Sequence, residues 1–149
     1  METKDQFEVD ILLVEDDPAD AELTVRALQR ANIANPIRVV RDGQEALDLM
    51  FGEGAYAGHG NVRPRVVLLD LKLPKVSGLE VLQRLKSDPN MRTIPVVVLS
   101  SVRDEPDVRE AWTLGANSYI VKPLDFEQFS AAVGNIGLYW LLLNRQPGT

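Results

Sequence analysis

Short, nearly continuous runs of apolar residues constrain most strongly what this chain can fold into. The runs are DILLVE (10–15), RVVLLD (65–70), PVVVLS (95–100) and SYIVK (118–122), with a weaker one, IRVV (37–40), after Pro36. Their Val, Ile and Leu residues do not alternate with polar ones, which is typical of strands buried on both faces of a parallel sheet. The runs therefore predict five parallel strands.

The segments between these runs have the spacing of amphipathic helices. Predicted helices cover 18–31, 43–51, 77–88 and 106–114, and a last one runs from about Asp125 towards Asn144. Asp17 is expected to cap the first helix, and Gly115 to end the fourth. The stretch 52–65 is expected to be one long loop. Strands alternating with five helices predict an α/β fold with a doubly wound, flavodoxin-like parallel sheet, commonly of order 2-1-3-4-5.

Composition narrows the class of protein. The chain's 149 residues suit one domain, and the absence of cysteine excludes disulfides, thiolate metal sites and cysteine nucleophiles. A net charge of −6 without a basic run argues against nucleic acid as a partner. No apolar stretch reaches the roughly 18 residues of a membrane span, and the polar start is unlike a signal peptide. We therefore expect a cytoplasmic protein that does not associate with membranes.

The predicted strands end in polar residues. The first ends in Glu15, Asp16 and Asp17, the third in Asp70, the fourth in Ser100 and Ser101, and the fifth in Lys122. In open α/β sheets, ligands bind beyond these carboxyl ends, where the strand order reverses. In the order 2-1-3-4-5, strands one and three are neighbours, so Asp16 and Asp70 are expected to meet.

Such a cluster of carboxylates calls for a cation. Two unit charges about 5 Å apart repel by about 3 kcal/mol at an effective dielectric of ~20. The site must therefore take up a proton, be well solvated or hold a cation, and oxygen ligands without His or Cys suit Mg²⁺. Lys122 adds a mobile positive charge, and Ser100 adds a hydroxyl. Carboxylate, metal, ammonium and hydroxyl together predict phosphoryl chemistry.

From about Ile11 to about Ile136 the sequence resembles the receiver domain of two-component response regulators, because four motifs of that family occur in the expected order. LLVEDDPAD, LLDLKLPKVSG, VVVLSS and GANSYIVKP are similar to its acidic-pair, phosphoacceptor, switch-hydroxyl and closing motifs. The resemblance implies that Asp70 accepts a phosphoryl group from a histidine kinase. The implied metal-site groups are Glu15, Asp16, Asp70 and the backbone carbonyl of Lys72. The implied switch residues are Ser100, Ser101 (in a slot that usually holds alanine), Tyr119 and Lys122.

Two further features bear on partners. The long 52–65 loop and the aromatic C-terminal helix look most like the stand-alone receivers associated with bacterial phytochromes, which implies a bacteriophytochrome as the kinase. LYWLLL (138–143) is apolar on all sides of its predicted helix, so we expect it to form a homodimer interface, the alternative being a helix end folded back on its own domain. Residues 1–149 are expected to be a single receiver domain without an output domain.

Simpler interpretations remain for single residues. Asp70 could be an acid in a turn, Ser100 a hydroxyl at a strand end, and Tyr119 an aromatic residue on an edge strand. Asp17 is expected to cap a helix. His59 is expected to be an exposed loop residue, and Trp112 is expected to pack a helix against the sheet. Two other classes compete with the receiver. A haloacid-dehalogenase phosphatase needs a cap domain and a second Asp where Lys72 stands. A pseudo-receiver would act without phosphorylation, but the intact acid cluster argues against this alternative. No enzymatic activity beyond self-phosphorylation and dephosphorylation is expected.

Overall fold

The computed structural model describes residues 9–58, 60–101, 104–122, 127–128, 130–132 and 135. It contains one parallel sheet, in the order β2-β1-β3-β4-β5. The strands are β1 (Ile11–Val14), β2 (Ile37–Val40), β3 (Val66–Leu69), β4 (Val96–Ser100) and β5 (Ser118–Val121). The predicted strands and their order are therefore confirmed.

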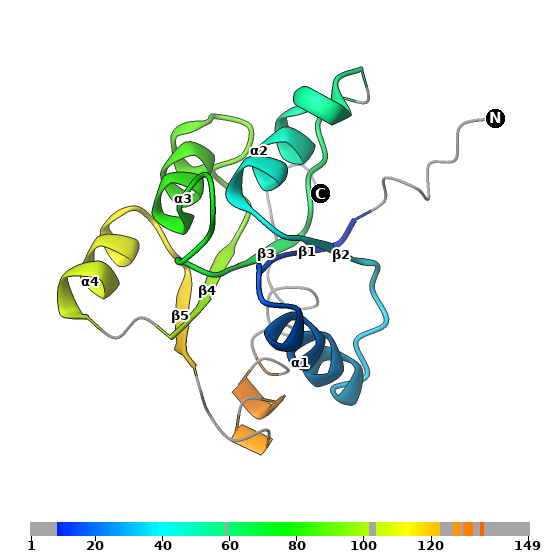
Figure 1. The fold of residues 1–149 in the computed structure, drawn as a ribbon, viewed down its shortest axis with the longest axis vertical. Coiled ribbons are helices and arrows are strands. Elements are labelled where there is room, and N and C mark those ends of the chain that lie inside the picture. The colour runs from blue at the N-terminus through cyan, green and yellow to red at the C-terminus, as the bar shows by residue number, and fades with distance from the viewer. Residues whose placement is uncertain are drawn as a thin grey trace.

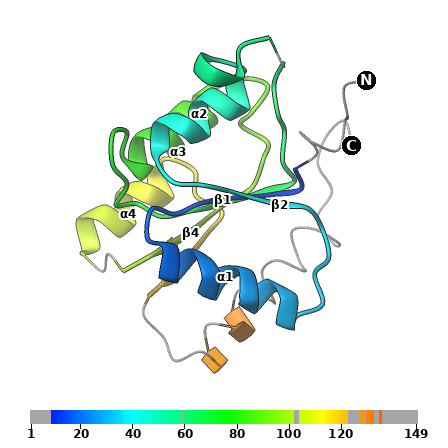
Figure 2. The same ribbon diagram turned by 45° about the vertical axis from the view of Figure 1, so that its right-hand side comes forward.

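Helices cover both faces of the sheet. The described helices are α1 (Pro18–Arg30), α2 (Gly43–Phe51), α3 (Gly78–Ser87) and α4 (Glu105–Thr113). Figures 1 and 2 show α1 on one face of the sheet and α2, α3 and α4 on the other. The predicted fifth helix lies mostly outside the described residues, as do LYWLLL (138–143) and His59. The residues described between 127 and 135 are helical.

The two-sided cover explains the continuous apolar runs. In β1, Leu12 and Val14 pack on the side of α2 and α3, while Ile11 and Leu13 pack on the side of α1. Because alternate residues of a strand point to opposite faces, both sets must be apolar when both faces are covered. β3 and β4 divide between the two cores in the same way.

α1 begins where the sequence predicts, directly after its cap Asp17. The Asp17 side chain caps it by accepting hydrogen bonds from the backbone N–H groups of Ala19 and Asp20, at 2.8 and 3.3 Å. Thr24 is buried although it is polar, because its hydroxyl donates to the Asp20 carbonyl oxygen at 2.9 Å. The apolar Val25, by contrast, is only half-buried.

Two predictions are wrong in detail. The 52–65 stretch is not all loop, because it contains a short 3₁₀ helix, η2 (Gly54–Tyr56). The Tyr56 hydroxyl there accepts a hydrogen bond from Arg38 of β2 at 2.8 Å. Trp112 does not pack a helix on the sheet: α4 turns the small Ala111 inward and leaves Trp112 50% exposed. No helix in the described part of the chain is long and apolar enough to cross a membrane.

Candidate functional site

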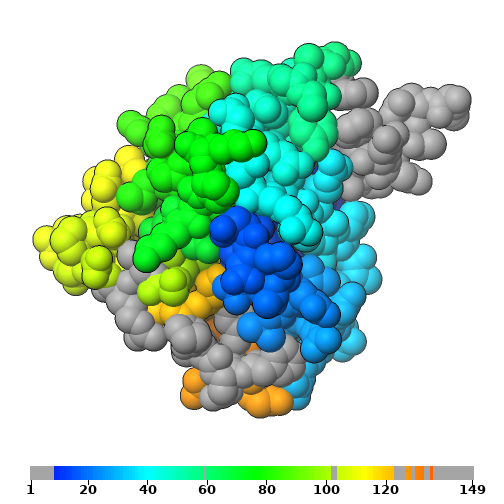
Figure 3. Space-filling model, in the orientation of Figure 1, coloured from blue at the N-terminus to red at the C-terminus, as the bar shows by residue number. Residues whose placement is uncertain are grey.

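The side chains predicted for the site come together at the carboxyl ends of the strands. Glu15 and Asp16 follow β1, Asp70 follows β3, and Lys122 follows β5. In the space-filling view the beginning of α1 (blue) lies against the loop after β3 (green) on one face of the molecule (Figure 3). This is the edge at which a doubly wound sheet binds ligands.

Three carboxylates form the acidic part of the site. Glu15, Asp16 and Asp70 each offer an oxygen within 4.8 Å of the others. Glu15 and Asp70 are buried, whereas Asp16 is exposed. Their backbones are fixed by the sheet, since the Asp70 N–H donates to the Val14 carbonyl oxygen at 3.1 Å. A cluster of carboxylates open to water on one side fits a hard divalent cation that keeps some of its water ligands.

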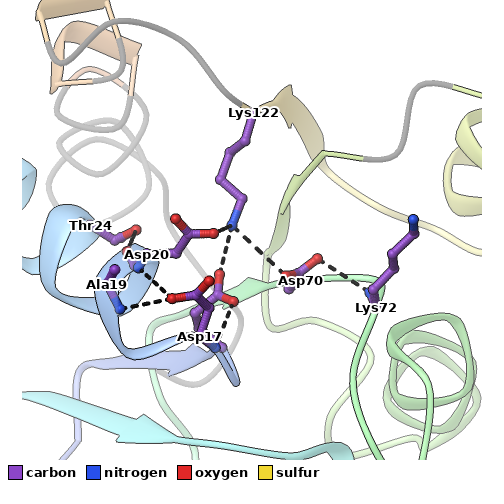
Figure 4. Close-up of polar contacts among 8 residues, drawn as sticks. Asp17, Ala19, Asp20, Thr24, Asp70, Lys72 and Lys122 are labelled. Carbon is purple, nitrogen blue, oxygen red and sulfur yellow. Dashed lines mark hydrogen bonds and ion pairs between the residues drawn. The ribbon is translucent and has the colours of Figure 1, made fainter.

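Lys122 is the positive centre of the cluster. Its Nζ lies 2.7 Å from Glu15 Oε1. It also lies 3.1 Å from Asp20 Oδ2 and 3.8 Å from Asp70 Oδ2 (Figure 4). The side chain of Lys122 is 7% exposed, so these carboxylates take the place of water around the ammonium. The ammonium therefore joins the acids of β1, α1 and β3.

Sequence reasoning missed Asp20. It does not end a strand, and an acid in the first turn of a helix has an ordinary role in complementing the helix dipole. The available signal was the helix start itself: with Asp17 as the cap, Asp20 lies one turn above the acids that end β1. Its contact with Lys122 depends on how α1 packs across the sheet, which a local pattern does not contain.

Burial and neighbouring charges change the pKa values in this cluster. Burial raises the pKa of Glu15 from 4.5 to about 7, against the effect of Lys122 and assisted by the negative charge of Asp70. Burial acts to lower the pKa of Lys122, but its pairing with Glu15, Asp70 and Asp20 outweighs burial and leaves the pKa raised. Lys122 is therefore a stable ammonium, and Glu15 can take up a proton near neutral pH.

The two predicted switch residues are in contact. Ser100, at the end of β4, is fully buried, and the half-buried Tyr119 lies on the neighbouring strand β5. Burial raises the pKa of Tyr119, and a side-chain hydrogen bond with Ser100 acts to lower it. The same strand pair holds the lysine, because the Lys122 N–H donates to the Ser100 carbonyl oxygen at 2.7 Å. Ser101 is exposed next to them.

The turn after β3 holds the Asp70 carboxylate. The Lys72 N–H donates to Asp70 Oδ1 at 3.2 Å, while Oδ2 faces Lys122 (Figure 4). Gly78 closes this turn by donating to the Leu71 carbonyl oxygen at 2.9 Å, and a Cβ on Gly78 would collide with the Asp70 carbonyl oxygen. The run LKLPKVSG therefore ends in glycine because α3 begins against the backbone of Asp70. The metal-ligand role of the Lys72 carbonyl stays a prediction.

Similar proteins carry the same fold. The chain matches the response regulator receiver domain over residues 11–134. FilR2 of Methanothrix harundinacea, a probable methanogenesis regulatory protein, is 45% identical over 148 residues, which cover 99% of this chain and 92% of that protein. The crystal structure of the phosphorylated cyanobacterial phytochrome response regulator RcpA has a TM-score of 0.83 at 40% identity, over 93% of this chain and 97% of that chain.

A third relative is Rcp1 of Synechocystis, a response regulator that is 37% identical over 131 residues, or 88% of each chain. Its Mn²⁺-bound crystal structure has a TM-score of 0.83 over 93% of this chain and 98% of that chain. Family match, sheet order and overall identity agree. The chain therefore belongs to the response regulator receiver domain family of two-component systems, and its relatives include stand-alone phytochrome response regulators.

Proposed function

We propose that this protein is a single-domain response regulator that accepts a phosphoryl group on Asp70 from a histidine kinase. The observation that carries the proposal is the convergence of Glu15, Asp16 and Asp70 within 4.8 Å, with the Lys122 ammonium beside them. A carboxylate at a rigid strand end, next to cationic groups, is placed to act as a nucleophile towards phosphorus.

In the proposed transfer, an Asp70 carboxylate oxygen attacks the phosphorus of a phosphohistidine. A P–O bond forms, the P–N bond breaks, and the electron pair of that bond leaves with the imidazole nitrogen, which then takes up a proton. Lys122 faces Asp70 Oδ2 and the Lys72 N–H binds Oδ1, so both oxygens have a fixed orientation before transfer. Ordering the nucleophile in this way lowers the entropic part of the barrier.

Glu15, Asp16 and Asp70 would hold a divalent cation, which we propose is Mg²⁺, with the Lys72 carbonyl as a further ligand. When bound, the ion neutralises charge on the phosphoryl oxygens during transfer. The acid cluster supports this assignment, as does the Mn²⁺-bound form of the relative Rcp1. Ser101, exposed beside the site, would adjust access of water and phosphodonors.

Ser100 and Tyr119 would carry the signal away from Asp70. An acyl phosphate adds about 1.5 to 2 negative charges and three acceptor oxygens. Ser100 and Lys122 would donate hydrogen bonds to those oxygens. Because Ser100 is hydrogen-bonded to Tyr119, turning its hydroxyl towards the phosphoryl group changes the contacts of Tyr119 and shifts the balance between two conformations of β5.

The proposed kinase is of the phytochrome type, since RcpA is a phytochrome response regulator. The similarity to FilR2 offers another signalling context. We further propose a cytoplasmic homodimer that forms through the C-terminal helix and acts by binding other proteins rather than nucleic acid or membranes. Phosphotransfer profiling against the histidine kinases of the same genome tests the partner: transfer from a phytochrome-type kinase faster than from all others is expected.

Labelling by a small phosphodonor tests the central claim. Incubation with acetyl phosphate and Mg²⁺ should add one phosphoryl group by intact-protein mass spectrometry, and Asp70→Asn should abolish the adduct. Asp88→Asn, the same substitution at the end of α3, is the matched control and should keep it. An adduct that persists in Asp70→Asn would remove Asp70 from its role. No adduct in the wild type would favour a phosphorylation-independent module.

A further inference from the structure

We propose that Asp20 is a positioning residue that holds Lys122 away from Asp70 until a phosphoryl group arrives. The inference rests on the proposed function, since it concerns how the same site changes on phosphorylation. The Lys122 ammonium is 2.7 Å from Glu15 and 3.1 Å from Asp20 but 3.8 Å from the acceptor Asp70. Lys122 therefore has its two shorter ion pairs with acids other than the acceptor.

The position of Asp20 is fixed by the start of α1. Its N–H donates to the Asp17 cap at 3.3 Å, and its carbonyl oxygen accepts from the Thr24 hydroxyl at 2.9 Å. The lysine backbone is fixed as well, because its N–H donates to Ser100 on β4. Two rigid elements thus present a carboxylate and an ammonium to each other across the edge of the sheet.

Asp20 is the partner that can release the lysine. The Glu15 side chain is 3% exposed, so leaving it ionised without Lys122 or a metal is costly, whereas the Asp20 side chain is 42% exposed and can be hydrated at once. A phosphoryl group on Asp70 adds charge that attracts Lys122. The ammonium then moves from Asp20 towards Asp70, and the strength of the Asp20 pair opposes that movement.

This competition predicts opposite effects on two ligands. Asp20→Asn removes the competitor for Lys122, so a phosphoryl analogue on Asp70 should bind more tightly. The same variant removes a negative charge beside the other acids and lets Lys122 pair more often with Glu15 and Asp70. Because Lys122 then competes more strongly for these carboxylates, a divalent cation should bind more weakly. A defect confined to the folding or capping of α1 would weaken both ligands.

The experiment uses the full chain with two probes: Mn²⁺ alone, titrated by its electron paramagnetic resonance signal, and beryllofluoride at saturating Mg²⁺, titrated by calorimetry. For Asp20→Asn and Asp20→Ala we expect Mn²⁺ affinity to fall and beryllofluoride affinity to rise, each by about threefold to fivefold, as suits a half-exposed ion pair. Glu22→Gln is the matched control, because it removes one exposed carboxylate from the same helix. It should leave both affinities unchanged.

The outcomes separate the inference from the proposed function. Suppose that the wild-type protein binds beryllofluoride. If the Asp20 variants then bind both probes as the wild type does, or if both affinities change in the same direction, only the proposed role of Asp20 is overturned. Wild-type protein that binds no beryllofluoride overturns the phosphoacceptor function, and the inference with it. Circular dichroism of each variant checks that its helix content equals that of the wild type before either affinity is compared.

Discussion

Two lysines occupy opposite ends of the sheet, and their surroundings differ in kind. Lys122, at the carboxyl ends, contacts three carboxylates. Lys86, near the amino ends of β4 and β5, donates to the carbonyl oxygens of Arg92 and Ile94 and to Asn117 Oδ1, at 3.1, 2.9 and 3.2 Å. Among the residues that the structure describes, Lys86 has no carboxylate partner.

The two pKa values follow this difference. Burial lowers the pKa of Lys86 from 10.5 to about 8, because its neutral acceptors satisfy hydrogen bonds without compensating the charge. Burial acts on Lys122 in the same direction, but the carboxylates more than offset it. Lys86, among neutral oxygens, ties the end of α3 to two loops, the one with Arg92 and Ile94 and the one with Asn117. Lys122 lies among more carboxylates than it can neutralise, and this excess of negative charge distinguishes its end of the sheet from the end that holds Lys86.

Replacing Lys122 should have the largest effect. Lys122→Met leaves the buried Glu15 and Asp70 without their cation, and in metal-free buffer we expect a loss of about 2–3 kcal/mol in the free energy of unfolding. This loss is smaller than for a buried carboxylate that stays ionised without a partner, because Glu15 can take up a proton. Urea denaturation with and without Mg²⁺ measures it: Mg²⁺ should bind more tightly and restore much of the stability. An equal loss in both buffers would show that Lys122 is mainly structural.

Replacing Lys86 should cost stability alone. Lys86→Met leaves the Arg92 and Ile94 carbonyl oxygens and the Asn117 amide without this donor, which costs about 1–2 kcal/mol in urea denaturation. Mg²⁺ and beryllofluoride affinities should equal those of the wild type. If Lys86→Met changed Mg²⁺ affinity as strongly as Lys122→Met, the distinction between the two ends of the sheet would be wrong.

The two ends should also respond oppositely to pH. Because the pKa of Glu15 is 4.5 when unfolded and about 7 when folded, the folded state binds the extra proton and metal-free stability falls as pH rises through this range. For Lys86, with 10.5 unfolded and about 8 folded, the unfolded state binds the extra proton and stability rises with pH between these values.

Denaturant midpoints measured across both ranges test this prediction. Glu15→Gln should flatten only the acidic part of the profile, and Lys86→Met only the alkaline part. Saturating Mg²⁺ should also flatten the acidic part, since the cation keeps Glu15 ionised. An acidic slope that survives both Glu15→Gln and Mg²⁺ would mean that another group titrates there.

The comparison also explains what the sequence could predict. The residues at the ends of β1, β3 and β5 were found because a parallel sheet brings the carboxyl ends of its strands to one edge, so Asp70 and Lys122 needed only the strand order to be placed together. The network of Lys86 was not found. It joins a helix end to two loops, and neither the lysine nor Asn117 stands at a position that strand or helix periodicity marks.

Residues on helices were predicted less well than residues on strands, for a related reason. A strand buried on both faces fixes the surroundings of every residue, whereas the face that a helix buries depends on its rotation. Thr24 is buried because it can donate to its own helix, and Trp112 is exposed because Ala111 is sufficient for the contact of α4. The contact of Asp20 with Lys122 was not predicted for the same reason, because it forms only through the packing of α1 on the sheet.

The smallest effect concerns the hydroxyl pair behind the site. Tyr119→Phe removes the hydrogen bond with Ser100. We expect the free energy of unfolding to fall by about 1 kcal/mol and the affinity for beryllofluoride to rise by less than about fivefold. Each change corresponds to one hydrogen bond. The binding tightens because Ser100 no longer has to leave Tyr119 to reach the phosphoryl analogue.

Tyr56→Phe is the matched control for this last prediction. The Tyr56 hydroxyl is also hydrogen-bonded, to Arg38 and Glu45 at 2.8 and 3.2 Å, but it belongs to η2, and neither of these partners is a residue of the site. Its loss should lower stability by a similar amount and leave beryllofluoride affinity unchanged. Tighter binding in Tyr119→Phe alone would show that the Ser100–Tyr119 bond opposes phosphoryl binding. Weaker binding in Tyr119→Phe would instead show that Tyr119 holds Ser100 in the orientation that the phosphoryl group needs, and the proposed direction of the switch would be reversed.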